Sequence, residues 1–198
     1  NDETITNALG QASSKDGVHY IVYSEEKIKT MTYYERIEEK IKGIQELKKC
    51  ILNWREQNQK IVFTNGCFDL LHLGHVDYLA KAKDLGDRLI IGVNTDASVR
   101  RLKGEFRPLQ DENSRLHLLA ALEVVDAVVL FDEDTPYELI KQVQPDVLVK
   151  GADYKPESIV GYDIVTSRGG KVETIEYLEG YSTTSIEQRI LKSREQTL

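Results

Sequence analysis

Short apolar runs alternate with longer mixed stretches along most of the chain. Short runs rich in aliphatic and β-branched residues at positions 61–63, 88–94, 126–131, 146–150 and 171–175 predict five strands, of which 61–63 and 88–94 are apolar enough to be buried on both faces. Between these runs, apolar residues recur every three or four positions, which is the spacing of one helical face. The alternation predicts right-handed βαβ units, and therefore an α/β fold: a Rossmann-like open parallel sheet with helices on both faces.

A different pattern precedes the first strand. Apolar residues recur at threes and fours over about 34–57, which predicts one amphipathic helix packed on the core or on a partner. The polar residues before it contain only one strand-like stretch, at 19–23. We interpret them either as an upstream or added extension before a native start at Met31, or as a linker from a preceding domain. The expected parts are the extension or linker 1–30, the N-terminal helix 31–58 and the main domain 59–198.

The first strand leads through a tight turn into a helix start. The apolar run at 61–63 breaks at Asn65-Gly66, and His72-Leu73-Gly74-His75 then opens a helical pattern. Free backbone N–H groups and the positive end of a helix dipole favour a phosphate there, and Gly74 lets the backbone approach a ligand closely. Ordinary core or surface roles for the histidines are an alternative. Metal ligation is a weaker one, because no cysteine or carboxylate cluster has zinc-like spacing nearby, so we expect no metal held by side chains.

Polar residues also follow the later strands. Residues 94–96 and 150–154 come at the carboxyl ends of two strands, the edge at which open parallel sheets bind ligands. Asp96 equally suits the cap of the helix that follows it. The basic, glycine-broken loop formed by 100–104 and Arg107-Pro108 suits a polyphosphate, although a solvated charge run would look the same. Near the end, residues 182–184 precede a helix, and hydroxyls at a helix start can cap it and bind phosphate at once.

Composition narrows the class of protein. The 198 residues are 40% hydrophobic, enough for one core and an appendage, and the net charge is −7. With no long Lys/Arg run, the positive field that binds nucleic acid is missing. Cys50 and Cys67 are too few for a disulfide scaffold, which fits a reducing cytoplasm. No stretch has the features of a signal peptide or a membrane span, so we expect a cytoplasmic protein without a membrane partner.

The motifs resemble a known family. Gly66-Cys67-Phe68-Asp69 with His72-Leu73-Gly74-His75 is similar to the signature of the cytidylyltransferase-like nucleotidyltransferases. Arg101–Gly104, Val147–Tyr154 and Gly180–Thr184 narrow the resemblance to the adenylyltransferase domain of heptose-1-phosphate adenylyltransferases, which make ADP-heptose for bacterial lipopolysaccharide cores. The resemblance implies transfer of AMP from ATP to a heptose 1-phosphate with release of pyrophosphate. It also implies Mg²⁺ bound with the ATP, a homodimer, and in some members fusion behind a sugar kinase.

Motifs and resemblance together give the expected site of this nucleotidyltransferase domain. The expected catalytic residues are His72, His75 and Lys103. The expected nucleotide contacts are Thr64, Asn65, Gly66, Phe68, Gly74, Arg115, Ser182, Thr183 and Thr184. The expected contacts to the acceptor sugar phosphate are Asp69, Asn94, Asp96, Lys150, Gly151, Asp153 and Tyr154.

Two alternatives remain at this point. A glycerol-3-phosphate cytidylyltransferase, or another sugar- or alditol-phosphate nucleotidyltransferase, would share the histidine motif and the Ser/Thr helix start. The segments Leu102–Gly104 and Lys150–Tyr154, which resemble the heptose branch, stand against it. A nucleotide-binding module without turnover is the other alternative, and the intact histidine pair argues against that.

Overall fold

The protein forms two compact units, residues 1–39 and 40–198, in a computed structural model that describes residues 12–15, 18–21, 30–153 and 155–195. The first unit contains the antiparallel strands β1 (Ala12–Lys15) and β2 (Val18–Ile21) and the helix α2 (Tyr33–Glu38). The strand expected at 19–23 is confirmed as far as Ile21, and its last two residues lie outside the described part. Whether residues 1–30 are an extension or a linker stays an expectation.

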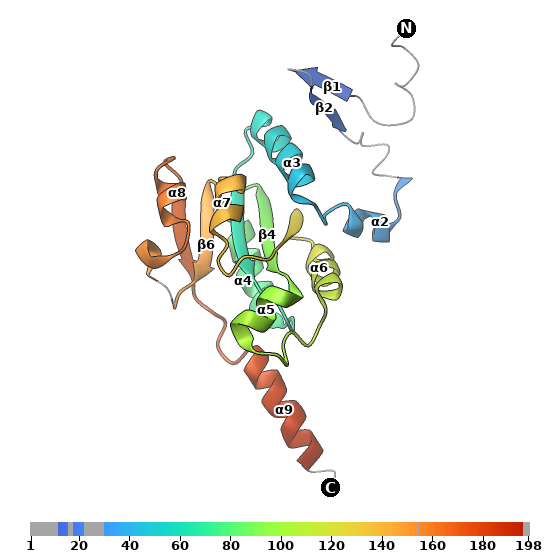
Figure 1. Cartoon of the computed structure of the whole chain (residues 1–198), viewed down its shortest axis with the longest axis vertical. Helices are drawn as coiled ribbons and strands as arrows, with labels where there is room; N and C mark the ends of the chain where they lie inside the picture. The colour runs from blue at the N-terminus through green and yellow to red at the C-terminus, as the bar shows by residue number, and fades with distance from the viewer. Residues whose placement is uncertain (1–11, 16–17, 22–29, 154, 196–198) are drawn as a thin grey trace. The chain divides into compact units, whose positions relative to one another are not determined.

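A five-stranded parallel sheet forms the centre of the second unit (Figure 1). Its strands are β3 (Ile61–Gly66), β4 (Arg88–Asn94), β5 (Ala127–Phe131), β6 (Val147–Gly151) and β7 (Lys171–Ile175). The spatial order β5-β4-β3-β6-β7 means that the chain builds outward from β3 on one side and then returns to build on the other. All five expected strands and their parallel pairing are confirmed. In such sheets, ligands bind outside the carboxyl ends where the order reverses, here between β3 and β6.

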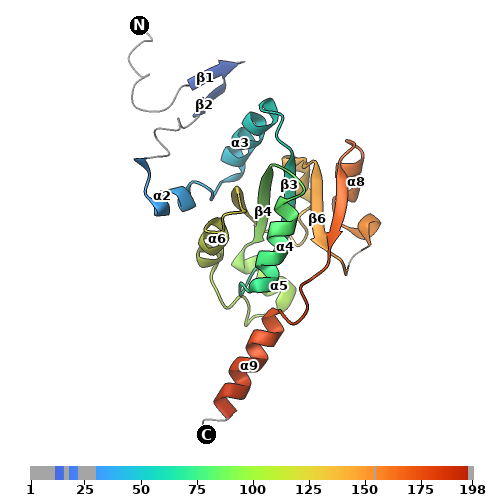
Figure 2. The same ribbon diagram turned by 180° about the vertical axis from the view of Figure 1, so that it is seen from behind.

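Helices cover both faces of the sheet, as the alternating pattern predicts. One face carries α4 (Leu73–Lys83) and α6 (Glu112–Ala120), with α4 in front of the strands in Figure 2. The other carries α3 (Ile44–Glu56), α7 (Tyr137–Val143) and α8 (Tyr162–Thr166). The short α5 (Asp96–Lys103) follows β4, and the 3-10 turn η1 (Pro156–Ser158) follows β6. In the described part of the chain, no helix is both long and apolar enough to cross a membrane.

Side chains alternate between the two faces along each strand. On β3, Ile61 and Phe63 join the buried cluster formed with α3 and α7, whereas Val62 points to the opposite face, toward Gly86 beyond the end of α4. These side chains are fully buried, and each contributes about 1.5–3 kcal/mol by leaving water. Because both faces are covered, β3 to β6 appear in the sequence as largely apolar runs, whereas the half-buried edge strand β7 contains Lys171 and Glu173.

The prediction of a single helix over about 34–57 is wrong. The structure has two helices, α2 and α3, separated by residues 39–43. Gly43 is the N-cap residue of α3, and its backbone N–H donates to the Glu46 carboxylate at 3.0 Å. A helix start therefore lies inside the segment that was expected to be continuous.

Residues 40–42 pair with the edge of the sheet instead of continuing a helix. Ile41 forms a one-residue parallel bridge with Val128 of β5. The Lys42 N–H donates to the Val128 carbonyl at 2.9 Å, and the Val128 N–H donates to the Lys40 carbonyl at 2.8 Å. Ile41 fits a helical spacing as well as a bridge, so the hydrophobic pattern could not reveal the interruption. The bridge covers part of an otherwise open strand edge.

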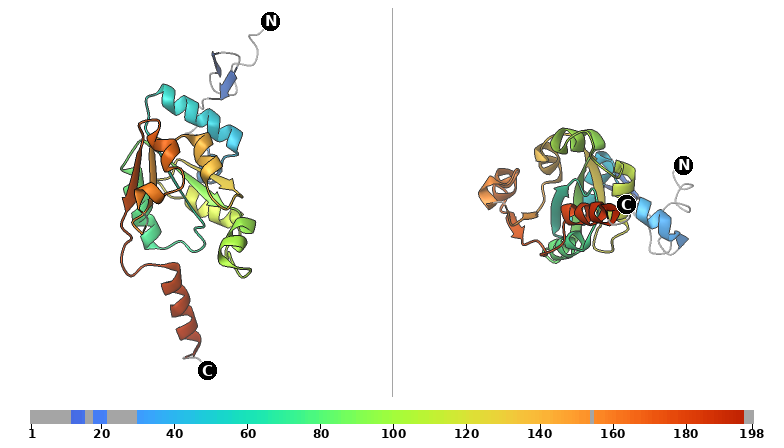
Figure 3. Two further views of the ribbon diagram at one scale, coloured as in Figure 1. Left: turned by 60° about the vertical axis from the view of Figure 1, so that its left-hand side comes forward. Right: turned by 90° about the horizontal axis from the view of Figure 1, so that it is seen from below.

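The last helix, α9 (Thr183–Glu195), extends beyond the carboxyl ends of the strands (Figure 3). The Ser182 hydroxyl accepts the backbone N–H of Ser185 at 3.0 Å, which confirms the expected cap. Ile190 and Leu191 on this helix are exposed.

Candidate functional site

A hollow of about 520 Å³ lies at the carboxyl ends of β3 and β6, where the strand order reverses. It is lined by residues from the turn after β3, the start of α4, the end of α5, the end of β6 and the segment that leads into α9. The lining residues are Asn65, Gly66, Cys67, Phe68, His72, Gly74, His75, Tyr78, Lys103, Lys150, Gly151, Tyr177, Tyr181, Ser182 and Thr183. Most of the expected catalytic and nucleotide residues are therefore together.

The two histidines of the motif stack on each other. His72 is the N-cap residue of α4 and His75 lies in its first turn, with the ring centroids 3.9 Å apart and the planes 25° apart. Phe68, in a left-handed backbone conformation with φ of 48°, places its ring 5.3 Å from that of His75. Both Nδ1 atoms are buried without a hydrogen-bond partner among the described residues. The imidazoles are thus held by packing and not by hydrogen bonds through Nδ1, and both residues line the hollow.

Burial keeps both histidines uncharged near pH 7. It lowers the pKa of His75 to about 4, with repulsion from His72 and Lys103 adding to the effect. Burial also lowers the pKa of His72. Each ring can therefore act as a neutral N–H donor. Binding of a polyphosphate would favour a charged imidazolium, because a nearby anion raises the pKa of a histidine.

Gly74 allows the start of α4 to pack closely. A Cβ atom at this position would lie 3.0 Å from Nδ1 of His72 and 3.2 Å from the carbonyl oxygen of Tyr181. Both distances are tighter than ordinary contacts. The glycine therefore lets the histidine motif approach the segment that leads into α9, so these two parts of the hollow sit side by side.

Two lysines bring positive charge to the hollow. Lys103 ends α5, and Lys150 lies near the end of β6, where its Nζ donates to the Asn65 side-chain oxygen at 2.5 Å. Burial lowers the pKa of Lys150 to about 8, while Cys67 and Asp153 oppose this shift. In a chain of net charge −7, these two lysines give the hollow a local positive charge.

Four residues lining the hollow were not predicted. Tyr78 donates to or accepts from the Thr64 hydroxyl at 2.8 Å, and it lies one helical turn after Gly74 and His75, so helical spacing from the motif could have found it. Cys67 and Tyr181 stand inside the quoted motifs. Tyr177, packed against Gly151, follows β7 without any local signal.

Arg115 is buried below the hollow instead of lining it. It is fully inaccessible to solvent, and its guanidinium donates to the carbonyl oxygens of Cys67, Asn94 and Gln110. It also pairs with the Asp96 carboxylate at 2.7 Å. In this arrangement the Arg115 guanidinium is not placed to contact a phosphate in the hollow directly. Arg115 instead joins the turns that follow β3 and β4.

Other expected contacts are also engaged inside the protein. Thr64 is fully buried, and its hydroxyl forms a hydrogen bond with the Tyr78 hydroxyl. Asn94 is 4% exposed, and its side-chain amide donates to the Ser98 hydroxyl at 2.9 Å. Asp69 is 3% exposed and accepts the backbone N–H groups of Leu109 and Gln110 at 2.7 and 3.0 Å. Burial alone would raise the pKa of Asp69, but its hydrogen bonds lower it.

The remaining expected residues lie at the margin. Asp153 and Thr184 are exposed and do not line the hollow. Tyr154 lies outside the described residues. Among the residues that the structure describes, no three His, Cys, Asp or Glu side chains gather closely enough to hold a metal ion.

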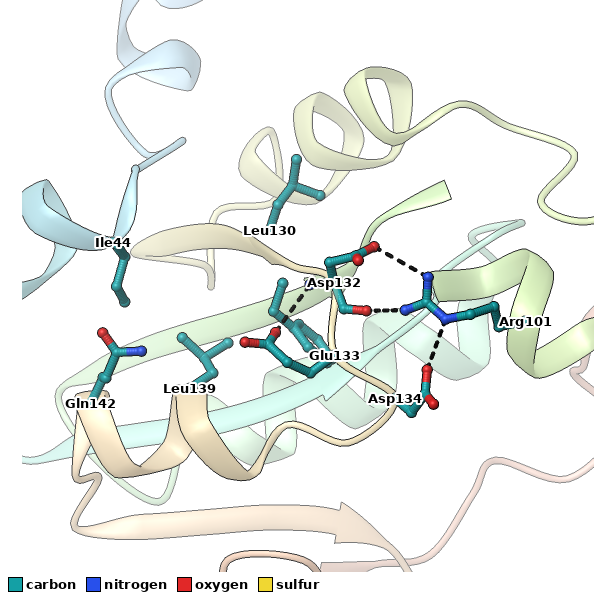
Figure 4. A pocket seen from close by; sticks show the side chains of 9 residues that line it. Ile44, Arg101, Leu130, Asp132, Glu133, Asp134, Leu139 and Gln142 are labelled. Carbon is teal, nitrogen blue, oxygen red and sulfur yellow. Dashed lines mark hydrogen bonds and ion pairs between the residues drawn. The ribbon is translucent and has the colours of Figure 1, made fainter. Parts of the chain in front are cut away.

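A second, larger hollow of about 630 Å³ lies at the end of β5, against α7 (Figure 4). Its rim is acidic, with Asp132, Glu133 and Asp134. Its arginine, Arg101, pairs with Asp134 at 2.9 Å and with Asp132 at 3.6 Å. This surface repels a polyphosphate, so the hollow with the histidines and lysines is the candidate site despite its smaller volume.

An open parallel sheet with paired histidines, two lysines and a hydroxyl-rich helix start at its switch point defines an α/β nucleotide-binding protein. The family model described as "Cytidylyltransferase-like" matches residues 63–189, which include the whole hollow. The chain belongs to the cytidylyltransferase-like family. The resemblance drawn from its motifs is thereby confirmed.

Curated relatives share the name "Bifunctional protein HldE". The one from Citrifermentans bemidjiense is 56% identical over 154 residues, which are 78% of this chain and 32% of that protein. The one from Trichlorobacter lovleyi is 50% identical over 185 residues, 93% of this chain and 38% of that protein. This chain therefore spans about a third of the length of these relatives.

A solved structure shares the fold. Pantoate-beta-alanine ligase from Francisella tularensis superposes with a TM-score of 0.52 at 18% identity, over 74% of this chain and 75% of that one. At this identity the likeness concerns the fold alone. It agrees with the Rossmann-like α/β class expected from the alternating pattern.

Proposed function

We propose that this chain is an adenylyltransferase domain that transfers AMP from ATP to a heptose 1-phosphate, giving ADP-heptose and pyrophosphate for lipopolysaccharide core synthesis. The observation that carries the proposal is the stacked pair His72 and His75 beside two lysines and the start of α9 in one hollow. The motifs that resemble the heptose branch, and relatives that are named bifunctional protein HldE, support the choice of substrates.

The chemistry needs no side-chain nucleophile. A phosphate oxygen of the sugar attacks the α-phosphorus of ATP, the new P–O bond forms, and the bond to the bridging oxygen breaks with its electrons leaving on pyrophosphate. Catalysis then depends on holding the two phosphates in line and stabilising the charge that develops. His72 and His75 donate to the α-phosphate oxygens, and Lys103 adds a positive charge beside them.

The start of α9 holds the leaving group. Ser182 and Thr183 line the hollow, and free N–H groups with hydroxyls at a helix start suit the β- and γ-phosphates; Thr184 follows them. Mg²⁺ enters as part of the substrate, bound to the phosphates of ATP. No step in this scheme requires a cluster of protein ligands for the ion.

The acceptor binds on the β6 side of the hollow. Lys150 faces the sugar phosphate with its ammonium group, and Asn65 holds that lysine in place. Gly151 and Asp153 follow it at the strand end. Arg115 and Asp69 act indirectly in this scheme, because both fix the turns that carry the contact residues.

The discriminating experiment is a matrix of two nucleotides against two acceptors. ATP and CTP are each tested with a heptose 1-phosphate and with glycerol 3-phosphate, and pyrophosphate release is measured. We expect turnover with ATP and the heptose 1-phosphate. Turnover with CTP and glycerol 3-phosphate would instead identify a glycerol-3-phosphate cytidylyltransferase, and nucleotide binding without pyrophosphate release would identify a binding module.

The relatives are about two and a half times as long as this chain, and their name states two functions. We therefore include in the proposal that the domain works beside a sugar kinase, in the cytoplasm and as a homodimer. Light scattering on the purified chain measures the oligomeric state directly. A monomer at micromolar concentration would contradict the dimer.

A further inference from the structure

Three segments that carry site residues are joined outside the hollow. Asp69 lies between β3 and the histidine motif, Arg107 follows Lys103 in the loop after α5, and Glu187 lies in the second turn of α9. None of the three lines the hollow. Arg107 contacts both acids, so one guanidinium connects the histidine segment, the Lys103 segment and the helix that starts with the Ser/Thr hydroxyls.

The contacts are specific and partly shielded from water. Nη1 of Arg107 donates to Oδ2 of Asp69 at 2.8 Å, and Nη2 donates to Oε1 of Glu187. The side chains are 23%, 2% and 28% exposed, respectively. The other oxygen of Asp69 accepts two backbone N–H groups from residues 109 and 110, so the loop around Arg107 is fixed from both sides. Hydrogen bonds between charged groups are the stronger class.

The helix α9 depends on contacts near its start. It extends away from the sheet, and its described side chains from Gln188 onward are exposed (Figure 3). Its orientation is therefore decided by its first turns, where Glu187 meets Arg107 and where the Tyr181 carbonyl faces Gly74. The same turns present Ser182 and Thr183 to the hollow.

We propose that Arg107 is a positioning residue, which fixes the start of α9 against the histidine motif so that the β- and γ-phosphates are held in line with the α-phosphorus. This inference rests on the proposed function, because it names a residue that the same reaction requires. It touches no substrate itself. Its loss should therefore weaken whatever the start of α9 binds, and spare ligands that do not reach that helix.

The test compares three ligands that differ in their phosphates. Equilibrium binding of ATP, AMP and pyrophosphate, each with Mg²⁺, is measured by calorimetry for the wild type and for Arg107→Ala. We expect about a tenfold weaker affinity for ATP and pyrophosphate, and an AMP affinity within twofold of the wild type. Arg107→Lys should recover part of the loss because it keeps one charged contact.

Controls separate positioning from general stability. Arg101→Ala is the matched control. Arg101 lies on α5, does not line the hollow, and like Arg107 pairs with two carboxylates. It should leave all three affinities unchanged. Glu187→Gln should reproduce part of the Arg107→Ala effect. The double variant Arg107→Ala/Glu187→Gln should be no worse than Arg107→Ala alone, because both changes break the same contact.

Several results would overturn the inference. An unchanged pyrophosphate affinity in Arg107→Ala, an equal loss for AMP, or the same pattern in Arg101→Ala would each do so. If Arg107→Ala does not fold, the affinities of the milder variant Glu187→Gln for ATP, AMP and pyrophosphate are compared with the wild type in its place, and the same outcomes support or overturn the inference. Binding does not depend on the acceptor, so a failed choice of heptose 1-phosphate leaves this test intact. Wild-type protein that binds neither ATP nor pyrophosphate would overturn both proposals.

Discussion

Each histidine of the candidate site combines a packed ring with a buried Nδ1 atom that has no hydrogen-bond partner in the described part of the chain. An unsatisfied buried nitrogen costs about 1–3 kcal/mol of stability. The stack of His72 on His75 also fixes both rings before the substrate arrives. Donors that are already in place need no reorganisation when charge develops on the α-phosphate.

Replacing either histidine should therefore slow the chemical step more than it weakens binding. We expect His72→Ala and His75→Ala to lower kcat by about 10²-fold or more, since one transition-state donor is worth on the order of 3 kcal/mol. The Kd for ATP should move far less. Steady-state kinetics and calorimetry on the same preparations measure both. Near-native kcat in both variants would remove the catalytic role assigned to the pair.

We expect Lys150 to give the proposed acceptor step a pH dependence. Its pKa of about 8 means that the ammonium is charged below pH 8 and is lost as the pH rises above it. If its charge binds the acceptor phosphate, the KM for the sugar phosphate should rise by about tenfold between pH 8 and 9.5, with a smaller change for ATP. Lys150→Met should raise this KM at pH 7 and flatten its rise. Lys81→Met, on the outer surface of α4, is the control and should keep the wild-type profile.

The elements around the hollow meet through small residues as well as charged ones. The start of α4 lies so close to the segment that leads into α9 that a Cβ at Gly74 would sit 3.2 Å from the Tyr181 carbonyl oxygen, which would have to shift by a few tenths of an ångström. We expect Gly74→Ala to lower the free energy of unfolding by about 1–3 kcal/mol and to lower kcat, because overpacking pushes the two helix starts apart. Thermal or urea unfolding and kinetics measure the two effects.

Gly43→Ala is the matched control for this substitution. Its added Cβ would meet only the Glu46 carboxylate, at an ordinary 3.5 Å, and it lies far from the hollow at the start of α3. It should change stability by less than about 1 kcal/mol and leave kcat unaltered. A Gly74→Ala variant indistinguishable from this control would show that the close approach is not needed.

For the whole molecule, the boundary between the two compact units predicts where the chain can be shortened. Removing residues 1–39 should leave turnover and the Tm of the second unit nearly unchanged, because that unit keeps its sheet and its site. Removing residues 1–43 also deletes the segment that pairs with β5. The three hydrogen bonds to Val128 and to the Leu122 carbonyl are then lost together with the N-cap residue of α3, and we expect a loss of at least about 2–3 kcal/mol.

Calorimetry and pyrophosphate release on the two truncated chains test this difference. The shorter chain should also associate more readily, because the edge of β5 becomes open to another strand. A folded but inactive chain lacking residues 1–39 would show that the first unit contributes to the site. Equal Tm values for both truncations would mean that the bridge at Ile41 stabilises nothing.

The sequence by itself determined the backbone frame. A buried strand such as 88–94 could be predicted because a strand covered on both faces is largely apolar, and the helix start at His72–His75 because glycine and polar turn residues mark it. The partly exposed strand 171–175 could be predicted because a glycine turn at 169–170 precedes it. The grouping of the histidines with Lys103 and Ser182 was implied by the resemblance of the motifs, and Lys150 was placed at the same edge by the rule that ligands bind at the carboxyl ends of parallel strands.

Only the tertiary structure decided what each polar side chain does at that edge. Arg115 and Asp69 are residue types that often contact ligands. Both are instead buried, and they form hydrogen bonds with backbone groups of other turns. Arg107 meets Glu187 across 80 positions of sequence, and Tyr177 reaches the hollow from beyond β7. Local pattern specifies the path of the backbone and the face on which a residue lies. Partners from distant segments are chosen by packing, which no stretch of neighbouring residues encodes.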